Sequence, residues 1–352
     1  MKIHFSTVSA LLLAIAAGWV QAGHAAPPLA ESYEIVARYP VGGSGGWDFL
    51  SVDEKRHRLY VSRGDHVQIL DIASGKVVGD LPGTAGVHGI AFAQDLGLGF
   101  TSNGRSDSVT VFELDAFAVV ATVKVTGSNP DAILYEPYSK RILTFNGRSA
   151  NVTAIDAATR RVVGTIAVSG KPEVAVADGR GRVYLNIENK NSIAVIDAAA
   201  LAVSKYWSLG SCEAPTGLAI DRQRNRLFSV CQNKKMIVVD GNNGNVVREL
   251  PIDAGADGAE FDAELNLAFS SNGEGTVTIV KSTESGQIAA IETVHTQKSA
   301  RTIALDSTTH RVYLPAASFG PPPPPTPEQP RPRPSMVPDS FVILVLAPKN
   351  PH

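Results

Sequence analysis

A short pattern of strand-forming residues recurs seven times along the chain, at intervals of 40 to 44 residues. Each copy contains an apolar run, a second strand with an aromatic residue or Leu at its centre, an Asn/Gly-rich loop and a β-branched strand. The centres of the second strands are Tyr60, Phe100, Leu143, Tyr184, Phe228, Phe269 and Tyr313. A period of this length, built only from strand signals, is typical of propeller blades. The sequence therefore predicts an all-β fold, a seven-bladed β-propeller of four-stranded antiparallel blades.

The repeats account for almost the whole chain. At about 40 residues per blade, we expect a propeller over residues 33–347, a linker over 27–32 and a tail over 348–352. The seventh repeat has no fourth strand of its own, whereas Tyr33–Tyr39 resembles the fourth strands of other repeats. We therefore expect the N-terminal strand to close the last blade, which would remove both open sheet edges.

Residues 1–26 have the pattern of a secretory signal peptide. Lys2 supplies the positive charge, Val8 to Val20 is an apolar stretch, and small residues crowd Ala22 to Ala26. The apolar stretch is short for a membrane span, and no charged stop-transfer sequence follows it. A membrane anchor is the alternative. We expect an exported protein, periplasmic or secreted, that is monomeric and has no membrane span in its mature chain.

The two cysteines, Cys212 and Cys231, flank the first two strands of the fifth repeat, in loops expected on one face. An oxidising compartment permits a disulfide across this 19-residue separation. Two free buried thiols are the alternative. We expect the disulfide.

A proline-rich insertion, residues 315–338, interrupts the period between Leu314 and Phe341. Proline cannot donate a backbone hydrogen bond and favours an extended conformation. The insertion stands where the other repeats have a short loop between their second and third strands. It is either a solvated surface strap, or a lid or partner-binding segment.

The second strands also carry a family resemblance. Arg58-Leu-Tyr-Val-Ser, Arg182-Val-Tyr-Leu-Asn and Arg311-Val-Tyr-Leu-Pro resemble the YVTN-type repeat, as do the following strands that end in Ile-Asp. Over residues 33–347 the chain resembles the exported YVTN-repeat, YncE-like propellers. The resemblance implies a seven-bladed propeller. It implies no catalytic residue, because the members have diverse proposed roles in ligand, surface and nucleic-acid binding.

Equivalent positions of the inner strands define a polar ring. In a propeller, the loops that enter the inner strands surround the central channel on one face. The seven equivalent residues there are Asp48, His88, Asp131, Glu173, Thr216, Asp257 and Arg301. Carboxylates and imidazoles bind divalent cations such as calcium, magnesium or a transition metal. The candidate metal ligands are therefore Asp48, His88, Asp131, Glu173 and Asp257, and the alternative is a solvated channel rim.

Arginines lie in the loops around this ring. Arg63, Arg105 and Arg148 occupy second-to-third strand loops, and together with Arg301 they are candidates to clamp an anionic group. Solubilising surface charge is the alternative. Trp47, next to the ring, is a candidate to stack on a planar ligand or a base, or else to pack at a blade junction.

Three functions fit these features. The formal net charge of −2 argues against a broad nucleic-acid footprint. The chain lacks the H-E-x-x-H and C-x-x-C-H motifs, and it has no G-x-S-x-G nucleophile elbow between a strand and a helix. Our leading interpretation is an exported binding or scaffold propeller that holds a small ligand, a cation or a protein partner at the channel mouth. The alternative is a metal-dependent hydrolase or lyase with His88 as general base. A second alternative is single-stranded DNA binding through Trp47 and the arginines.

Overall fold

The computed structural model describes residues 1–2, 32–283, 285–326, 329–330, 332–349 of the chain. The expected signal peptide and linker therefore lie outside the described residues, apart from Met1, Lys2 and Ser32. In the described part, no helix is long and apolar enough to cross a membrane.

The described chain is all-β, with one short 3-10 helix at Glu188–Lys190. Five sheets have four antiparallel strands each. In order across each sheet, they are β1 (Tyr33–Pro40), β27 (Val342–Pro348), β26 (Arg311–Ala316), β25 (Ala304–Asp306); β12 (Arg161–Ala167), β11 (Asn151–Asp156), β10 (Arg141–Asn146), β9 (Pro130–Glu136); β13 (Pro172–Ala177), β14 (Arg182–Ile187), β15 (Ser192–Asp197), β16 (Ala202–Ser208); β17 (Pro215–Asp221), β18 (Arg226–Cys231), β19 (Lys235–Asp240), β20 (Val246–Pro251); and β21 (Ala256–Asp262), β22 (Leu267–Asn272), β23 (Thr276–Ser282), β24 (Ile288–His295).

The sixth sheet has seven strands because one long strand serves two groups. Its order is β2 (Leu50–Asp53), β3 (Arg58–Ser62), β4 (Gly64–Asp71), β5 (Val77–Ala93), β6 (Leu98–Asn103), β7 (Ser108–Glu113) and β8 (Val119–Lys124). The first part of β5 pairs with β4, as in Val67 with Leu81. The last part pairs with β6, as in Ala91 with Phe100. The repeat does not predict this long strand, since it predicts separate four-stranded blades.

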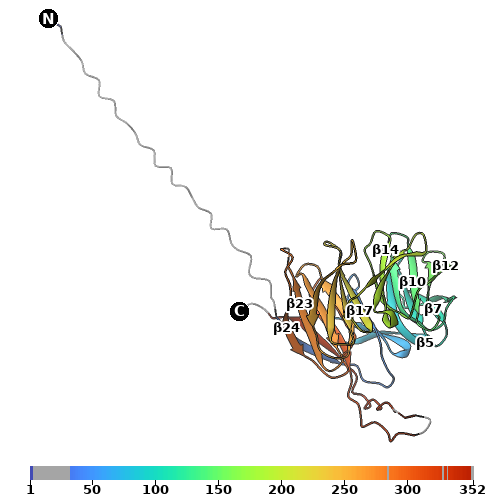
Figure 1. Ribbon diagram of the computed structural model, residues 1–352. Helices are drawn as coiled ribbons and strands as arrows, with labels where there is room; N and C mark the ends of the chain where they lie inside the picture. Colours follow the sequence, from blue (N-terminus) through green and yellow to red (C-terminus); the bar gives the residue numbers. More distant parts are fainter. Residues whose placement is uncertain (3–31, 284, 327–328, 331, 350–352) are drawn as a thin grey trace.

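The sheets pack around a centre. The strands β2, β5, β9, β13, β17, β21 and β25 each contact the next, and β25 contacts β2 again. Figure 1 shows the sheets side by side in chain order. The aromatic and leucine centres of the second strands are fully buried. Phe269, for example, packs with Val312 and Leu344 of the neighbouring sheet. This β-propeller-like arrangement follows from the repeat, since each sheet buries apolar side chains against its neighbours.

The N-terminal strand completes the last sheet, as the sequence predicts. Strand β1 pairs antiparallel with β27, with Tyr33 opposite Pro348 and Tyr39 opposite Ile343. The first and last strands of the described chain therefore pair with each other in one sheet, so the edge of β27 that faces β1 is not exposed.

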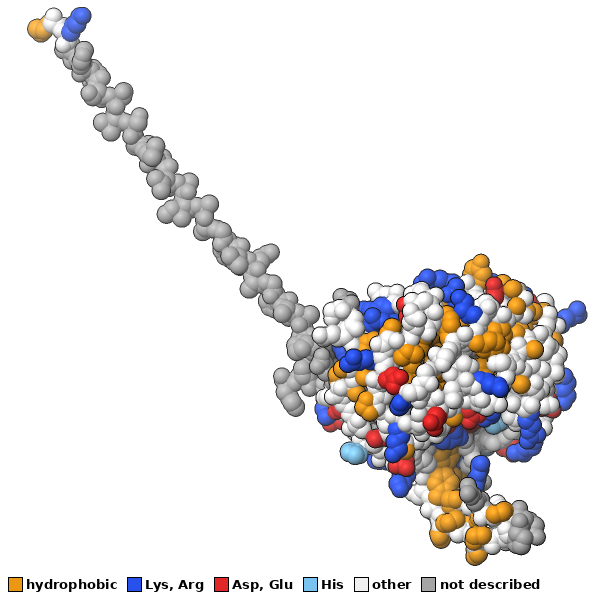
Figure 2. Space-filling model, viewed as in Figure 1, with side chains coloured by type: hydrophobic (Ala, Val, Ile, Leu, Met, Phe, Trp, Pro, Cys, Tyr) orange, Lys and Arg blue, Asp and Glu red, His pale blue; other side chains and the backbone are white. Residues whose placement is uncertain are grey.

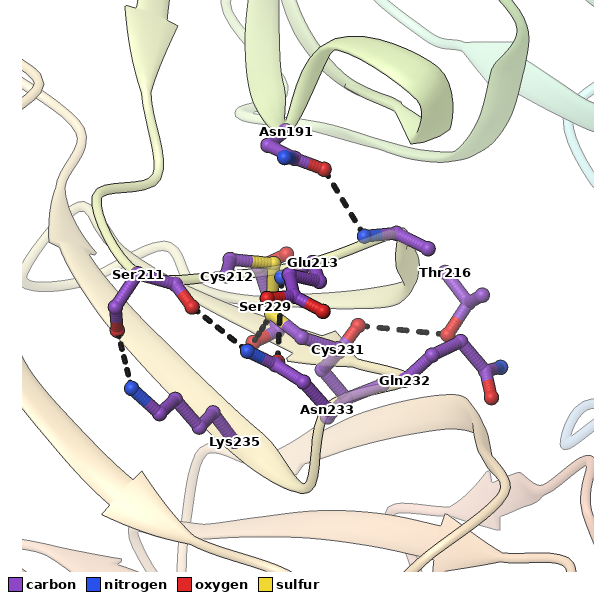
Figure 3. The surroundings of a disulfide bond; sticks show 12 residues. Asn191, Ser211, Cys212, Glu213, Thr216, Ser229, Cys231, Gln232, Asn233 and Lys235 are labelled. Atoms are coloured by element: carbon purple, nitrogen blue, oxygen red, sulfur yellow. Dashed lines mark hydrogen bonds between the residues drawn. A yellow bond between two sulfur atoms is a disulfide. The ribbon is translucent and has the colours of Figure 1, made fainter.

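The expected disulfide is present. Cys212 and Cys231 are bonded, with their Cα atoms 5.6 Å apart, and both are buried. Cys231 is the last residue of β18 rather than a loop residue. Around the bond (Figure 3), the Asn233 side chain donates to the Ser211 carbonyl, and Lys235 donates to the Ser211 hydroxyl. A disulfide favours an oxidising environment, which agrees with export.

Candidate functional site

Five residues of the predicted ring form one continuous chain of polar contacts. Nδ1 of His88 lies 2.6 Å from Oδ2 of Asp48 and 3.6 Å from Oδ1 of Asp131. On the other side, the Arg301 guanidinium lies 3.0 Å from Oδ1 of Asp48 and also bonds Asp257. The alignment of the repeats therefore predicted five residues that contact one another in sequence around the ring: Asp257, Arg301, Asp48, His88 and Asp131. We call these five residues the polar chain.

The fold fixes the polar chain through its backbone. Four side-chain hydroxyl or amide groups each donate a hydrogen bond to the backbone carbonyl of a ring residue in the neighbouring sheet. Such bonds hold adjacent inner strands in register at the channel mouth, so the side chains of the ring are placed before any ligand binds. The donor and acceptor pairs are Ser102 with Asp131, Asn186 with Thr216, Ser271 with Arg301, and Thr302 with Asp48.

The other two ring residues do not join this chain. Glu173 pairs with Lys171, whose ammonium nitrogen lies 2.6 Å from it and also bonds Glu188. Thr216 is buried, and its hydroxyl donates to the Ala256 carbonyl at 2.9 Å. Glu173 is therefore paired with a cation that the ring prediction missed and that it shares with Glu188, and Thr216 connects two sheets.

Burial shifts the ionisation of the ring. It raises the pKa of Asp131 to about 6 and that of Glu173 to about 8. It also raises the pKa of Asp257, although Arg301 opposes this. Burial lowers the pKa of His88, but the hydrogen bond to Asp48 and the charge of Asp131 outweigh it and the pKa is raised. Burial therefore makes the charged form of these carboxyl groups unfavourable, and a bound proton or a nearby cation offsets this effect.

Arginines line a cavity of about 620 Å³ next to the polar chain, and Trp47, Asp48, His88 and Asp107 also line it. Its guanidinium groups come from Arg105, Arg148, Arg301 and Arg333. Arg105, Arg148 and Arg333 are exposed. Within the part of the chain that the structure describes, their side chains make no hydrogen bond or ion pair. We call this space the arginine cavity.

Gly86 allows Arg105 to take this place. Its φ is +70°, and a Cβ on it would lie 2.6 Å from the Arg105 backbone nitrogen. The Gly86 carbonyl also accepts the Gly104 amide at 2.8 Å. A side chain at position 86 would strain the backbone and displace the Arg105 loop.

The prediction that Arg63 helps to clamp an anion is wrong. Arg63 is buried rather than part of the arginine cavity, and its guanidinium carbon lies 3.8 Å from the centre of the Phe341 ring. It donates to the carbonyls of Gly42 and Ser44 and to the Gln68 side chain. Its two terminal nitrogens thus hold the loop before β2 and bond β4, whereas its Nε has no hydrogen-bond partner among the described residues. Because the side chain is buried, it is unavailable to an anion in the arginine cavity.

Trp47 forms a wall. Its ring packs 5.1 Å from Phe341 and 5.9 Å from Phe319, between centroids. Of the two alternatives raised for this residue, packing is therefore observed. It still lines the arginine cavity with part of its surface.

Arg333 was missed because it lies in the proline-rich insertion, which has no counterpart in the other repeats. Glu260 was also missed. It lies in β21, lines the channel beside Leu134 and Ala304, and has no hydrogen-bond partner among the described residues. Burial raises its pKa to about 8, while Arg222 lowers it and Glu54 raises it.

Replacing Glu260 with Gln is expected to stabilise the protein at pH 8 and not at pH 4. Since the folded pKa of about 8 exceeds the ordinary carboxyl value, the folded state binds a proton that the unfolded state releases, and stability falls as pH rises from about 4 to about 8. A shift of this size corresponds to about 4–5 kcal/mol at pH 8. Because Glu260 is partly exposed, we expect a smaller gain, on the order of 2 kcal/mol. Urea unfolding at both pH values measures it, with exposed Glu213→Gln as control. Equal gains at both pH values would contradict it.

The comparisons with known proteins define the fold and no more. Neither a protein-family model nor a curated protein matches this sequence. Among solved structures, the chain is similar to a hydrazine synthase from Kuenenia stuttgartiensis, with 17% identity and a TM-score of 0.68. The likeness covers 84% of this chain and 96% of that one. At such identity, it shows a shared fold and carries nothing about activity.

Proposed function

We propose that the protein is an exported, seven-bladed propeller of the YVTN-repeat type, spanning residues 33–347 behind a signal peptide, that binds a small anionic molecule in the arginine cavity. The blade count rests on β5, whose two halves pair with different strands, so the seven-stranded sheet divides into two blades. Export is supported by the disulfide between Cys212 and Cys231.

One observation carries the binding proposal: three exposed arginines that make no hydrogen bond or ion pair among the described residues line one cavity with Arg301. Guanidinium groups match carboxylate and phosphate oxygens with two parallel hydrogen bonds. Two carboxylates lie nearby, since Asp65 interacts with Arg105 through space and Asp107 lines the same cavity. They offset the charge of Arg105, Arg148 and Arg333 only in part, so a bound anion relieves the remaining repulsion.

Part of the polar chain also favours an anion in this cavity. Asp48 is shared by His88 and Arg301, so these two donors are held where they line the cavity. Asp131 and Asp257 belong to the same ring but do not line the cavity. An anion is therefore favoured on the side of the ring where the arginines lie.

The double variant Arg105→Ala/Arg148→Ala is expected to bind phosphate and succinate at least about 100-fold more weakly than the wild type, because it loses two charge-assisted hydrogen bonds of about 1.5–3 kcal/mol each. Isothermal titration calorimetry of the mature chain at low salt measures the affinities. The matched control is Arg248→Ala, an exposed arginine on the outer strand β20, which should bind as the wild type does. No saturable binding of either anion by the wild type would contradict the proposal.

A metal-dependent hydrolase or lyase is the second candidate. It is favoured by Asp48, His88 and Asp131, which offer ligand atoms within 4.8 Å of one another. Elemental analysis after dialysis against calcium and against zinc decides it. One bound ion per chain, lost in Asp131→Asn, would support this candidate, and no ion under either condition would exclude it. Single-stranded DNA binding is disfavoured, because the formal net charge of −2 gives no broad basic surface for a phosphate backbone.

A further inference from the structure

We propose that the ligand is an amphipathic organic anion whose apolar body lies in a second cavity beneath the proline-rich insertion. This inference rests on the proposed function, since it takes the anionic group to be bound in the arginine cavity. The insertion then recognises the apolar body of the ligand as well as its charge.

The second cavity adjoins the arginine cavity. It has a volume of about 800 Å³, and its apolar lining residues are Trp47, Phe319, Met336 and Pro338. Both cavities are lined by Gly46, Trp47 and Arg301, so one molecule can contact both. The size suits a small organic ligand, since such sites measure about 300–1,000 Å³. We call this space the apolar cavity.

The base of the insertion is built as a hairpin. Phe319 and Met336 form an antiparallel bridge. The amide of Gly320 donates to the Ser335 carbonyl at 2.9 Å, and that of Val337 donates to the Ser318 carbonyl at 2.8 Å. Figure 1 shows this segment projecting from one end of the molecule. Paired arms give the cavity a wall that exists before a ligand binds.

The wall is fastened to the loop before β2. A carboxylate oxygen of Asp339 accepts the Gly43 amide at 3.1 Å, and Trp47 packs on Phe319. Arg63 holds the other side of the same loop through Ser44. The two sides of the apolar cavity are therefore joined to each other and to the body of the propeller.

Apolar surface is left open in this cavity. Phe319 is 44% exposed, and Met336 and Trp47 are partly exposed. Figure 2 shows hydrophobic side chains along the base of the projecting segment. An apolar ligand body removes such surface from water, and the rings of Trp47 and Phe319 favour a flat aromatic one.

The insertion reaches both halves of such a ligand. Phe319 and Met336 line the apolar cavity, whereas Arg333 of the same segment lines the arginine cavity. Since one segment supplies an apolar wall and a cation, it selects for molecules that carry both an apolar body and a negative charge. The insertion then has a role in ligand binding, which is neither that of a surface strap nor that of a partner-binding segment.

The test compares inorganic phosphate with 2-naphthyl phosphate, using calorimetric titration of the mature chain. The wild type should bind 2-naphthyl phosphate at least about tenfold more tightly than phosphate, because the bicyclic ring is buried. Phe319→Ser and Met336→Ser should each remove most of this difference and leave phosphate affinity unchanged. Arg148→Ala should weaken both ligands by a similar factor. Exposed Tyr138→Ser, outside both cavities, is the control.

The outcomes separate this inference from the proposed function. If the wild type binds both ligands equally, or if neither Phe319→Ser nor Met336→Ser changes the preference for 2-naphthyl phosphate, the inference is overturned while anion binding stands. If the wild type binds neither ligand, both proposals are overturned. Thermal melting of each variant verifies that it is folded. Because Phe319→Ser and Met336→Ser are independent, the test remains possible if one of them does not fold.

Discussion

Removal of the Cys212–Cys231 disulfide is expected to lower the free energy of unfolding by about 3 kcal/mol. The bond joins residues 19 apart in sequence and therefore restricts the unfolded chain. In the folded protein the loop that carries Cys212 keeps other anchors. Asn233 and Lys235 both bond Ser211, and Asn191 accepts the Ala214 amide (Figure 3). The loss should therefore arise mainly from a freer unfolded state.

Urea unfolding of Cys212→Ser/Cys231→Ser measures this loss. Wild-type protein in reducing agent should unfold at the same urea concentration as the double variant, whereas reducing agent should leave the double variant unchanged. Hydrogen exchange of the Ser211 to Ala214 loop should stay close to that of the wild type. An unchanged midpoint after complete reduction would contradict the prediction.

Arg63→Ala is expected to cost about 2–3 kcal/mol of stability. The guanidinium is buried on the Phe341 ring, and it satisfies the carbonyls of Gly42 and Ser44. Its loss leaves these acceptors without their donor and opens a void above the ring. Arg63→Met should recover the packing part of the loss only, because a thioether cannot donate hydrogen bonds.

Chemical denaturation and hydrogen exchange test this role. Both Arg63 variants should exchange the amides of Gly43 to Trp47 faster than the wild type, since this loop loses its anchor. Exposed Arg105→Ala is the control and should change stability by less than about 0.5 kcal/mol. If Arg63→Ala and Arg105→Ala cost the same, Arg63 does not hold the loop.

Sequence reasoning succeeded where the repeat determines the structure. Equivalent positions of the blades share a place in the fold, so aligning the repeats put Asp48, His88 and Arg301 in one ring, as observed. The N-terminal strand could be assigned for the same reason, because the seventh repeat lacks one strand. In both cases a short local pattern is sufficient, since each sheet contacts only its neighbours.

Side chains whose contacts lie outside the repeat could not be predicted from the sequence. Arg63 and Arg148 occupy comparable loops, but only Arg63 meets Phe341, which arrives from the far end of the chain. Arg333 enters the arginine cavity from an insertion without counterparts. The partner of Glu173 is Lys171, a cation with no equivalent in the ring column. Such side chains depend on packing between unlike segments, which periodicity does not encode.

The pairing of β1 with β27 sets the order in which the protein is completed. Tyr33 is among the first described residues to be synthesised, and its partner Pro348 is among the last. Until the C-terminal strand is available, a nascent chain has two exposed strand edges and an open ring. Closure then joins segments at the greatest separation in sequence, which makes it a slow, late step. A chain that stalls before β27 therefore carries two strand edges that are prone to aggregation.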